Sequence, residues 1–379
     1  MSTVFIDLNQ TEDVRDVIHR AVEALSSGKI IAFQTETVYG LAASALQPAA
    51  VERLWEIKGR DPEKPFALAV KSYEEALDYI PNMTPTAKRL ARRCWPGPVT
   101  LVMDDHPQSV IHQLDAAVVR ATVPKGTIGL RVPDDEFALA ILRMCAGPIV
   151  LTSANRSGQP AANNGQEVQA QLGDDVDLVI EGGPTRYMGA STVVRVGDEV
   201  TILREGVVKE SVIRELTDFV ALVVCTGNTC RSPMAEGIMK MLFAKNLGCE
   251  LDEVGAHGVA ILSAGIAAMP GAPAAAQSVE VMRQMGVDIS PHNSQPVTQR
   301  LAQCSDVIFT LTNGHRQAIV SQWPELESTV RTLRPDGGDI ADPIGSPVSV
   351  YQTCAQQIQQ CIEHWTQTID FQEFKKRTS

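Results

Sequence analysis

The stretch from Val223 to Ser232 constrains the fold of this chain most strongly. Two apolar residues lead into Cys225, and Arg231 follows after five intervening residues, with Ser232 directly behind it. This order predicts a strand, a tight loop and the N-terminus of a helix. The backbone N–H groups of such a loop and the positive end of the helix dipole can together hold a tetrahedral anion.

The same loop predicts a nucleophile. The field of a helix N-terminus favours the thiolate form of a cysteine, and the thiolate is the nucleophilic form. The planar guanidinium of Arg231 can bind two phosphate oxygens at once, and Ser232 can donate a hydrogen bond to the sulfur. We therefore predict that Cys225 attacks a phosphoryl group. The rest of the expected phosphate-binding loop comprises Thr226, Gly227, Asn228, Thr229 and Cys230.

A lone cysteine and arginine at this spacing arise often by chance, so the loop needs independent support. Gly227 and Asn228 supply the backbone freedom that a tight loop requires. Asp342, in an Asp-Pro corner far downstream, is the candidate general acid for the leaving group and the later base for water. An aspartate of this kind is more often a turn residue or a helix cap, and its value comes from its pairing with the loop.

The loop begins too late in the chain to belong to a single domain that starts at residue 1. A length of 379 residues also favours two domains. We expect a first domain over residues 1–208, a linker over 209–220 and a second domain over 221–379. The linker is charged and poor in glycine and proline, which predicts a brief helix.

Composition excludes several classes of protein. The net charge of −12 argues against strong direct binding of nucleic acid and favours a substrate that fits a pocket. No apolar stretch is long enough to span a bilayer, and the N-terminus does not resemble a secretion signal, so we expect no membrane association. The eight cysteines form no CxxC pairs, which predicts no metal site and a reducing, cytoplasmic location.

Strands and helices alternate in the first half and end in a hairpin over residues 192–196 and 200–204, which predicts a mixed-sheet α/β domain. Three polar clusters follow strands or helices there, at residues 35–39, 58–60 and 153–155. Ligand sites in open sheets gather where strands end. Lys58 and Arg60, separated by one glycine, suit a polyphosphate, although alone they would more often form a solvated helix end.

Six motifs of this half occur in the order found in one family. They are Thr-Glu-Thr-Val-Tyr-Gly-Leu at 35–41, Lys-Gly-Arg at 58–60, Trp-Pro-Gly-Pro at 95–98, Arg-Val-Pro at 131–133, Thr-Ser-Ala-Asn-Arg-Ser-Gly at 152–158 and Ser-Thr-Val-Val at 191–194. Residues 10 to 208 thus resemble the threonylcarbamoyl-AMP synthase (YrdC-like) family. The resemblance implies that L-threonine, bicarbonate and ATP with Mg²⁺ give threonylcarbamoyl-AMP and pyrophosphate. The product would pass to a separate tRNA-modifying complex that makes threonylcarbamoyladenosine.

The resemblance also implies roles for individual residues. Around the ATP phosphates and the transferred group it places Lys58, Arg60, Ser153 and Asn155. On the threonine side it places Thr35 and Tyr39, with Arg131 nearby, and beside the nucleotide it places Ser191 and Arg204. The chain departs from the family pattern at Gln34, where proline is usual, and at Asp134-Asp135.

The second half alternates strand and helix, which predicts a parallel, Rossmann-like sheet with the anion loop after its first strand. Residues 221 to about 368 resemble the low-molecular-weight protein phosphatase family, which needs no cofactor. Besides the loop, the matching motifs are Ser-Ala-Gly at 263–265, Gly-Val-Asp-Ile-Ser-Pro-His at 286–292 and Asp-Pro at 342–343. The loop is most similar to that of bacterial protein-arginine phosphatases, because Thr229 stands where tyrosine-specific members carry an aliphatic residue.

This resemblance favours a phosphorylated protein as substrate, with phosphoarginine ahead of phosphotyrosine. Ile344 argues against it, because an aromatic residue commonly follows the Asp-Pro pair. Alternatives are a protein-tyrosine phosphatase, a phosphatase-like domain that acts as a regulatory or binding module, an arsenate reductase, and a carbamoyl-transfer role for the first half. Cys230 is either a packing residue or a thiol that resolves oxidised Cys225.

Overall fold

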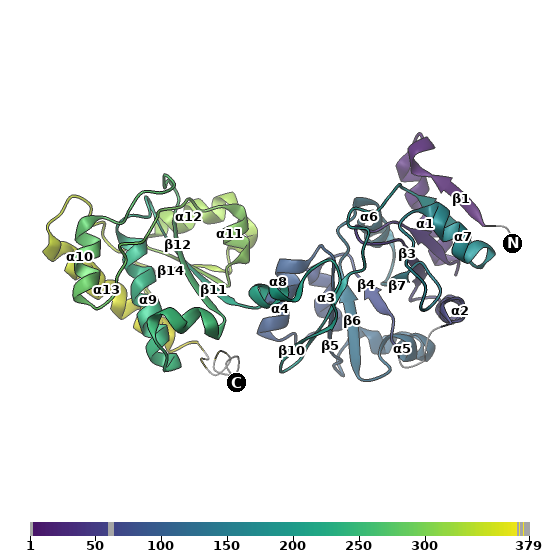
Figure 1. Cartoon of the computed structure of the whole chain (residues 1–379), viewed down its shortest axis with the longest axis horizontal. Helices are drawn as coiled ribbons and strands as arrows, with labels where there is room; N and C mark the ends of the chain where they lie inside the picture. Colours follow the sequence, from purple (N-terminus) through teal and green to yellow (C-terminus); the bar gives the residue numbers. More distant parts are fainter. Residues whose placement is uncertain (1–2, 60–63, 370, 372–373, 375–379) are drawn as a thin grey trace. The chain divides into compact units, whose positions relative to one another are not determined.

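The computed structural model describes residues 3–59, 64–369, 371 and 374. The chain divides into two compact units, Met1–Leu216 and Thr217–Ser379, and each has its own sheet and hydrophobic core (Figure 1). The predicted order of a mixed-sheet α/β unit followed by a parallel-sheet unit is confirmed. Within the described ranges, no helix combines the length and the apolar character needed to cross a membrane.

The N-terminal unit contains one large sheet in the order β1-β8-β2-β3-β7-β4-β6-β5-β9-β10. Its strands are β1 (Val4–Asp7), β2 (Ile31–Phe33), β3 (Gly40–Ser44), β4 (Ala67–Ala69), β5 (Val99–Asp104), β6 (Thr127–Arg131), β7 (Ile149–Ser153), β8 (Leu178–Glu181), β9 (Thr192–Val196) and β10 (Val200–Arg204). Its helices are α1 (Val14–Ser26), α2 (Pro48–Lys58), α3 (Tyr73–Tyr79), α4 (Pro85–Cys94), α5 (Ala116–Thr122), α6 (Glu136–Met144), α7 (Gly165–Leu172) and α8 (Glu210–Leu216).

Strand β3 is the element that brings the polar clusters of this unit together. It pairs antiparallel with β2 on one side and with β7 on the other, with Gly40 opposite Ser153. The loop between β2 and β3 therefore lies beside the end of β7. The sequence did not predict this strand, because its short Ala-rich run is buried at four of five positions and shows no alternation of polar and apolar residues.

Helix α2 places Lys58 in the same region. Pro48 occupies the first turn of the helix, where its missing N–H costs nothing, and Gly59 ends the helix in the left-handed conformation with φ of 52°. Lys58 is consequently the last residue of the helix and is buried there. Arg60, the second cation of this motif, lies outside the described residues.

The C-terminal unit has a four-stranded parallel sheet in the order β12-β11-β13-β14. Its strands are β11 (Phe219–Cys225), β12 (Val259–Gly265), β13 (Val307–Thr310) and β14 (Val330–Thr332), and its helices are α9 (Arg231–Leu247), α10 (Ala276–Gln284), α11 (Gln299–Cys304), α12 (Asn313–Gln322) and α13 (Val348–Thr366).

Helices cover both faces of this parallel sheet, as expected when the crossovers between parallel strands are helical. Ala221, Val223 and Cys225 of β11 belong to the core formed with α9, α10 and α13. Leu222 and Val224 belong to the core formed with α11 and α12 on the opposite face. This alternation along one strand explains why β11 is apolar at nearly every position.

Two segments near the unit boundary differ from sequence expectations in their limits. The segment over 209–220, expected as a linker with a brief helix, contains α8 and then the first residues of β11. Helix α9 begins at Arg231, although the sequence predicted its start at Pro233. Proline is frequent in the first turn of helices, and Pro233 is the third residue of α9. Arg231 and Ser232 therefore both lie in this first turn.

Candidate active sites

Cys225 is the last residue of β11, and its sulfur lies at the start of the loop that leads into α9. The side chain is buried, with its Sγ 2.9 Å from Oγ of Ser232. The backbone N–H of Asn228 also donates to this sulfur at 3.2 Å. Hydrogen bonds to sulfur stabilise its anionic form. The strand, loop and helix thus assemble as the sequence predicted and place two donor groups at the thiol.

Asn228 holds the loop in its tight shape. Its φ of 54° is in the left-handed region, which few residues other than glycine adopt. The side-chain Nδ2 donates to Ser232 and to Ser263, each at 2.9 Å, and Oδ1 accepts from the backbone N–H of Gln295 at 2.9 Å. The Asn228 carbonyl lies 2.8 Å from Nε2 of His292. These contacts fix the loop to side chains and backbone of three neighbouring segments.

Gly265, at the end of β12, permits the close approach of this loop to the neighbouring strand. A Cβ atom at this position would lie 2.4 Å from the carbonyl oxygen of Thr226 and 2.9 Å from the backbone nitrogen of Asn228. Both are backbone atoms of the phosphate-binding loop, so they could not yield without deforming it. The Ser-Ala-Gly motif is therefore explained by packing against the loop.

Arg231 carries positive charge into the first turn of α9. Its Nη1 donates to the carbonyl oxygen of Ile340 at 3.0 Å, and its Nη2 is ion-paired with Asp342. Within the described part of the chain its Nε is buried and has no hydrogen-bond partner. An unsatisfied donor on a buried cation is costly, and such a group commonly marks the place of a bound anion. Arg231 and Asp342, distant in sequence, thus meet at the loop.

The other side chains of the loop contact one another or residues of α12 and α13. Thr229 Oγ1 lies 3.7 Å from the sulfur of Cys230, which in turn lies 3.5 Å from the hydroxyl of Tyr351 on α13. Burial, followed by the contact with Cys230, raises the pKa of Tyr351. Thr226 is exposed, and its hydroxyl lies 2.9 Å from Nε2 of His315 on α12. Ile344 is 68% exposed, so it forms no packed wall.

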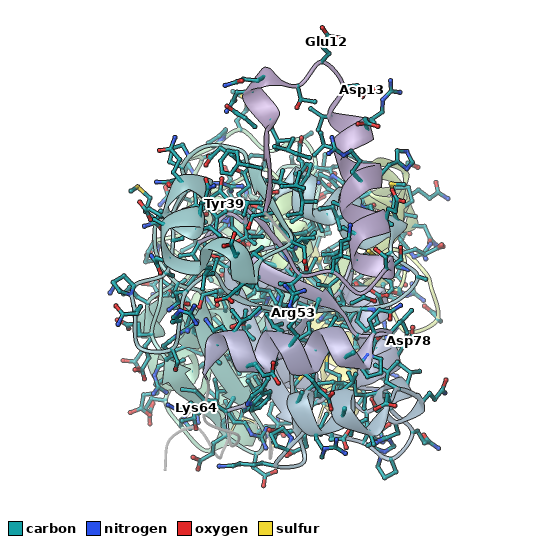
Figure 2. The ribbon with its side chains drawn as sticks, turned by 90° about the vertical axis from the view of Figure 1, so that its right-hand side faces the viewer. Glu12, Asp13, Tyr39, Arg53, Lys64 and Asp78 are labelled. Carbon is teal, nitrogen blue, oxygen red and sulfur yellow. The ribbon has the colours of Figure 1, made fainter. Side chains whose placement is uncertain are left out.

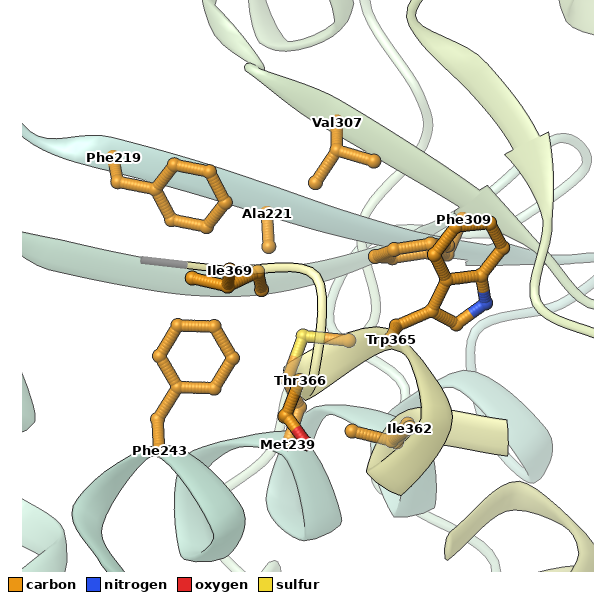
Figure 3. A pocket seen from close by; sticks show the side chains of 10 residues that line it. All are labelled: Phe219, Ala221, Met239, Phe243, Val307, Phe309, Ile362, Trp365, Thr366 and Ile369. Atoms are coloured by element: carbon orange, nitrogen blue, oxygen red, sulfur yellow. The ribbon is translucent and has the colours of Figure 1, made fainter. Parts of the chain in front are cut away.

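A second feature of the C-terminal unit is an apolar pocket remote from Cys225 (Figure 3). It is small and is lined by Phe219, Ala221, Met239, Phe243, Val307, Phe309, Ile362, Trp365, Thr366 and Ile369. Phe219 begins β11 and Cys225 ends it, so the two ends lie about 20 Å apart at the usual rise per residue of a strand. Among the described residues, no charged side chain lines this pocket. We therefore look for the catalytic groups of this unit in the loop that follows Cys225.

In the N-terminal unit, Lys58 meets Ser153 and Asn155 at the end of β7. Its ammonium group donates to the Ser153 carbonyl at 2.7 Å, to the Asn155 carbonyl at 2.5 Å and to Oδ1 of Asn155 at 2.7 Å. The Ser153 hydroxyl donates to the same Oδ1 at 2.6 Å. Three of the four residues expected around the ATP phosphates therefore lie together, and Arg60 lies outside the described residues.

Arg131 lies at the end of β6 and contacts the loop between β2 and β3. Its Nη2 donates to Oγ1 of Thr37 at 2.9 Å, and Thr37 Oγ1 lies 2.9 Å from Oγ1 of Thr35. The same Nη2 is 2.8 Å from Oε1 of Glu36, although this ionic contact is not aligned as a hydrogen bond. Glu36 is 2% exposed, and its two carboxylate oxygens accept no hydrogen bond within the described residues. Thr35 and Arg131 are thus brought together through Thr37.

Ser191 and Arg204 form a second contact at the β9–β10 hairpin. Arg204 Nη2 donates to the Ser191 carbonyl at 2.7 Å and to its hydroxyl at 3.1 Å. Partial burial and then the nearby positive charge of Arg131 lower the pKa of Arg204. Lys58, Arg131 and Arg204 therefore give this unit several cations at the ends of its strands, as an anionic substrate requires.

Tyr39 lies inside the N-terminal unit, among side chains of several segments (Figure 2). It is fully buried, and its hydroxyl donates to Oε1 of Glu181 at 3.1 Å or to the carbonyl of Gly183 at 3.0 Å. The backbone N–H of Gly182 donates to this hydroxyl at 3.0 Å. Burial raises the pKa of Tyr39. The phenol is therefore neutral, and its hydrogen-bond partners are protein groups.

The positions at which the chain departs from the family pattern form a local network. Gln34 Nε2 donates to Oδ2 of Asp135 at 3.3 Å, and a Cβ atom on Gly182 would lie 2.4 Å from the Gln34 side chain. Burial raises the pKa of Asp135, and the nearby charge of Glu36 adds to this. Gln34 is therefore packed tightly beside the threonine-side loop.

Sequence reasoning missed four residues that the structure places at the sites, namely Glu36, Thr37, Glu181 and His315. The first two stand inside a recognised motif, where a carboxylate between two hydroxyls was a usable signal. The residues next to Glu181 and His315 in the sequence form no motif that would indicate a role at either site. Glu181 and His315 lie more than 80 residues from their partners, as the separations of 142 and 89 residues show. Within the described residues, no group of three or more His, Cys, Asp or Glu side chains could hold a metal ion.

Two family models match the chain. The model described as Telomere recombination (Sua5_yciO_yrdC) matches residues 23–206. The model described as low molecular weight phosphotyrosine protein phosphatase matches residues 220–376. The two matches fall one in each unit and account for most of the chain.

Curated relatives match the first half. The threonylcarbamoyl-AMP synthase of Bacillus subtilis (strain 168) is 33% identical over 211 residues, which cover 55% of this chain and 59% of the relative. The chain therefore spans less than two thirds of the length of this relative. The threonylcarbamoyl-AMP synthase of Vibrio cholerae is 34% identical over 194 residues, which cover 50% of this chain and 97% of the relative.

Solved structures match both units. Pyrococcus abyssi Sua5 is 23% identical with a TM-score of 0.51, and the match covers 70% of this chain and 91% of that chain. The YwlE arginine phosphatase of Geobacillus stearothermophilus is 30% identical with a TM-score of 0.35, over 40% of this chain and 92% of that chain. The C-terminal unit is thus similar to low molecular weight phosphotyrosine protein phosphatases, and the chain belongs through its N-terminal unit to the Sua5/YciO/YrdC family of threonylcarbamoyl-AMP synthases.

Proposed function

We propose that this chain is a bifunctional enzyme, with threonylcarbamoyl-AMP synthesis in the N-terminal unit and cysteine-dependent protein phosphatase activity in the C-terminal unit. In the first reaction the amine of L-threonine captures bicarbonate as a carbamate, with loss of water. A carbamate oxygen then attacks the α-phosphorus of ATP, and pyrophosphate leaves. The product serves a separate tRNA-modifying complex that forms threonylcarbamoyladenosine.

The observation that carries the synthase proposal is the meeting of Lys58 with Ser153 and Asn155 at the end of β7. Arg131 and Arg204 end two further strands of the same sheet, and Arg131 is already ion-paired with Glu36. Arg204 hydrogen-bonds only neutral atoms of Ser191 among its described contacts, so it can still pair with a carboxylate or phosphate. P. abyssi Sua5 forms a complex with L-threonine, which supports an amino acid as one ligand of this fold.

The N-terminal residues act by positioning and charge neutralisation, because the transfer needs little covalent help from the protein. Lys58, with Ser153, Asn155 and Arg60, would bind the phosphates of MgATP. Ser191 and Arg204 would lie by the nucleotide. Thr35 and Arg131 would face threonine, with Tyr39 supporting their loop. Mg²⁺ enters as part of the MgATP substrate.

The observation that carries the phosphatase proposal is the buried, unsatisfied Nε of Arg231 beside Cys225. The thiolate attacks phosphorus, an S–P bond forms, and the bond to the leaving nitrogen or oxygen breaks. Asp342 in its acid form gives that atom a proton. Water then attacks the phosphocysteine while Asp342 accepts a proton, and inorganic phosphate and the thiolate are released. Arg231 and Ser232 stabilise the charge that develops on oxygen and sulfur.

We further propose phosphoarginine as the preferred substrate, ahead of phosphotyrosine. The Thr229 hydroxyl lies in the loop with only a 3.7 Å contact to sulfur, so it remains available to a polar guanidinium. Ile344, which the sequence counted against phosphoarginine, is exposed and forms no wall of the site, so it does not decide between the two substrates. If phosphotyrosine peptides were hydrolysed at least as fast as phosphoarginine peptides, the tyrosine-phosphatase alternative would replace this preference.

One assay pair on the full chain tests the two activities. Pyrophosphate release that requires both L-threonine and bicarbonate would support the synthase, and phosphate release from phosphopeptides would support the phosphatase. A chain that binds phosphopeptides without releasing phosphate would instead be a regulatory or binding module. Absence of threonine-dependent pyrophosphate release would contradict the first half of the proposal.

A further inference from the structure

His315 is a buried histidine of α12 whose ring contacts the phosphate-binding loop. It lies in the first turn of α12, with 5% of its surface exposed. Its Nε2 is 2.9 Å from Oγ1 of Thr226, the residue that follows Cys225. Its backbone N–H donates to Thr312, which caps the helix, so the position of the ring is set by the helix start.

The charge around this imidazole disfavours its protonated form. Three charged groups act on the ring, namely Arg231 of α9 and the carboxylates of Asp339 and Asp342 in the loop before α13. Burial and then Arg231 lower the pKa of His315 to about 4, and the two aspartates offset only part of this effect. The ring is accordingly neutral at neutral pH, and one of its two nitrogens carries the single proton.

The contacts of the two nitrogens indicate which of them carries the proton. In the described part of the chain, Nδ1 is buried and has no hydrogen-bond partner. A proton on Nδ1 would create an orphaned buried N–H, and orphaned donors are rarer in proteins than under-used acceptors. A proton on Nε2 instead makes a hydrogen bond to Thr226. The Thr226 oxygen then accepts, and its own proton stays free to point away from the ring.

We propose that His315 is a positioning residue of the phosphate site: its Nε2–H donates to Oγ1 of Thr226 and thereby directs the Thr226 hydroxyl proton toward the bound phosphoryl group. Thr226 is exposed at the start of the loop that is expected to bind phosphate, one residue after Cys225. With the opposite tautomer the hydroxyl would donate to the ring and be lost to the substrate. The proposal deepens the phosphatase function proposed above and rests on the same site.

The tautomer is tested by nitrogen-15 NMR of the full chain, in which ring protons are correlated with both ring nitrogens. The signals of His315 are identified by their loss in His315→Gln. We expect a protonated Nε2 and an unprotonated Nδ1 throughout pH 5 to 8. A protonated Nδ1, or titration of the ring within that range, would overturn the proposal. This readout does not depend on any enzymatic activity.

The positioning role is tested by calorimetric binding of inorganic phosphate to the full chain and to His315→Leu, His315→Gln, Thr226→Ala and the double variant His315→Leu/Thr226→Ala. We expect about tenfold weaker binding for His315→Leu and for Thr226→Ala, with no further loss in the double variant. Gln retains a side-chain N–H near the position of Nε2, so His315→Gln should stay within about threefold of the natural chain.

The controls separate three outcomes. Losses that multiply in the double variant, or equal losses for the Gln and Leu variants, would show a merely structural role and contradict the proposal. Unchanged amide hydrogen exchange of β11 and α12 would show that the C-terminal unit of each variant is folded. Phosphate binding that follows the expected pattern in a chain that hydrolyses no phosphopeptide would support this proposal while the phosphatase proposal fails.

Discussion

Arg231 and Asp342 are ion-paired across the candidate phosphatase site, with Nη2 of the arginine donating to Oδ2 of the aspartate. The arginine side chain is 5% exposed and the aspartate side chain 38%. The cation that should bind the phosphoryl group thus already holds the carboxylate that should protonate the leaving group. We expect a bound phosphoryl group to compete for Arg231 and so to free Asp342 to turn to the leaving atom.

This competition predicts opposite effects of Asp342→Asn on catalysis and on binding. Loss of the general acid should lower kcat by about a hundredfold or more, the usual range for such a group. Removal of the competing negative charge should tighten binding of inorganic phosphate severalfold. Asp336→Asn is a matched control, because Asp336 pairs with Arg334 at the surface. Weaker phosphate binding in Asp342→Asn would contradict the competition.

Cys225→Ser should abolish phosphate release from phosphopeptides, because an alcohol in this loop is a far weaker nucleophile than a thiolate. Threonine-dependent pyrophosphate release should be unchanged, since the synthase residues all lie in the other unit. Cys249→Ser, at a partly exposed position, serves as a control for the loss of a sulfur atom. Phosphatase activity that survives Cys225→Ser would mean that the nucleophile is misassigned.

Lys58→Ala should reduce pyrophosphate release by at least a hundredfold, because it removes a buried cation held against Ser153 and Asn155. The phosphatase rate should not change. Lys71→Ala is the control, because Lys71 lies at the surface beside Glu75. The measurement is coupled pyrophosphate detection at saturating ATP, L-threonine and bicarbonate. Full activity of Lys58→Ala would refute the assignment of the ATP site.

Thr229→Ile should shift the preference of the phosphatase from phosphoarginine toward phosphotyrosine. The change replaces a hydroxyl by an aliphatic group of similar branching, so the loop itself should be retained. We expect kcat/KM for phosphoarginine peptides to fall about tenfold or more, while that for phosphotyrosine peptides holds or rises. An unchanged ratio of the two values would remove Thr229 as the basis of the preference.

The pKa of His315 predicts how the stability of the C-terminal unit depends on pH. In the folded chain this pKa is lowered from 6.5 to about 4. Between these values the unfolded chain binds a proton that the folded chain does not, so stability falls as pH decreases through this window. One such proton contributes at most about 1.4 kcal/mol per pH unit.

The test compares the natural chain with His315→Gln, which lacks this titrating group. Amide hydrogen exchange of β11 and α12, measured from pH 4 to 8, reports the stability of the C-terminal unit. The natural chain should lose more stability than the variant below pH 6.5, and the two should run parallel above it. Parallel curves over the whole range would show that His315 does not carry this effect.

Local signals in the sequence determined a large part of this protein. The hairpin over residues 192–196 and 200–204 was predicted at its observed limits, because turn residues separate its two strands. The loop from Cys225 to Arg231 could be assigned as an anion site because its strand, loop and helix are consecutive in the chain. Family motifs likewise located Lys58 and Asn155.

Only the tertiary structure decided which distant groups meet. Strand β3 was missed because its short, mostly buried run has no alternating pattern, and its place between β2 and β7 depends on pairing across the sheet. The partners of Tyr39 and Thr226, namely Glu181 and His315, are contributed by segments 142 and 89 residues away. Such contacts depend on how strands and helices stack, and no local propensity encodes that stacking. The tautomer of His315 and the unsatisfied Nε of Arg231 follow from burial, which arises only when the chain has packed.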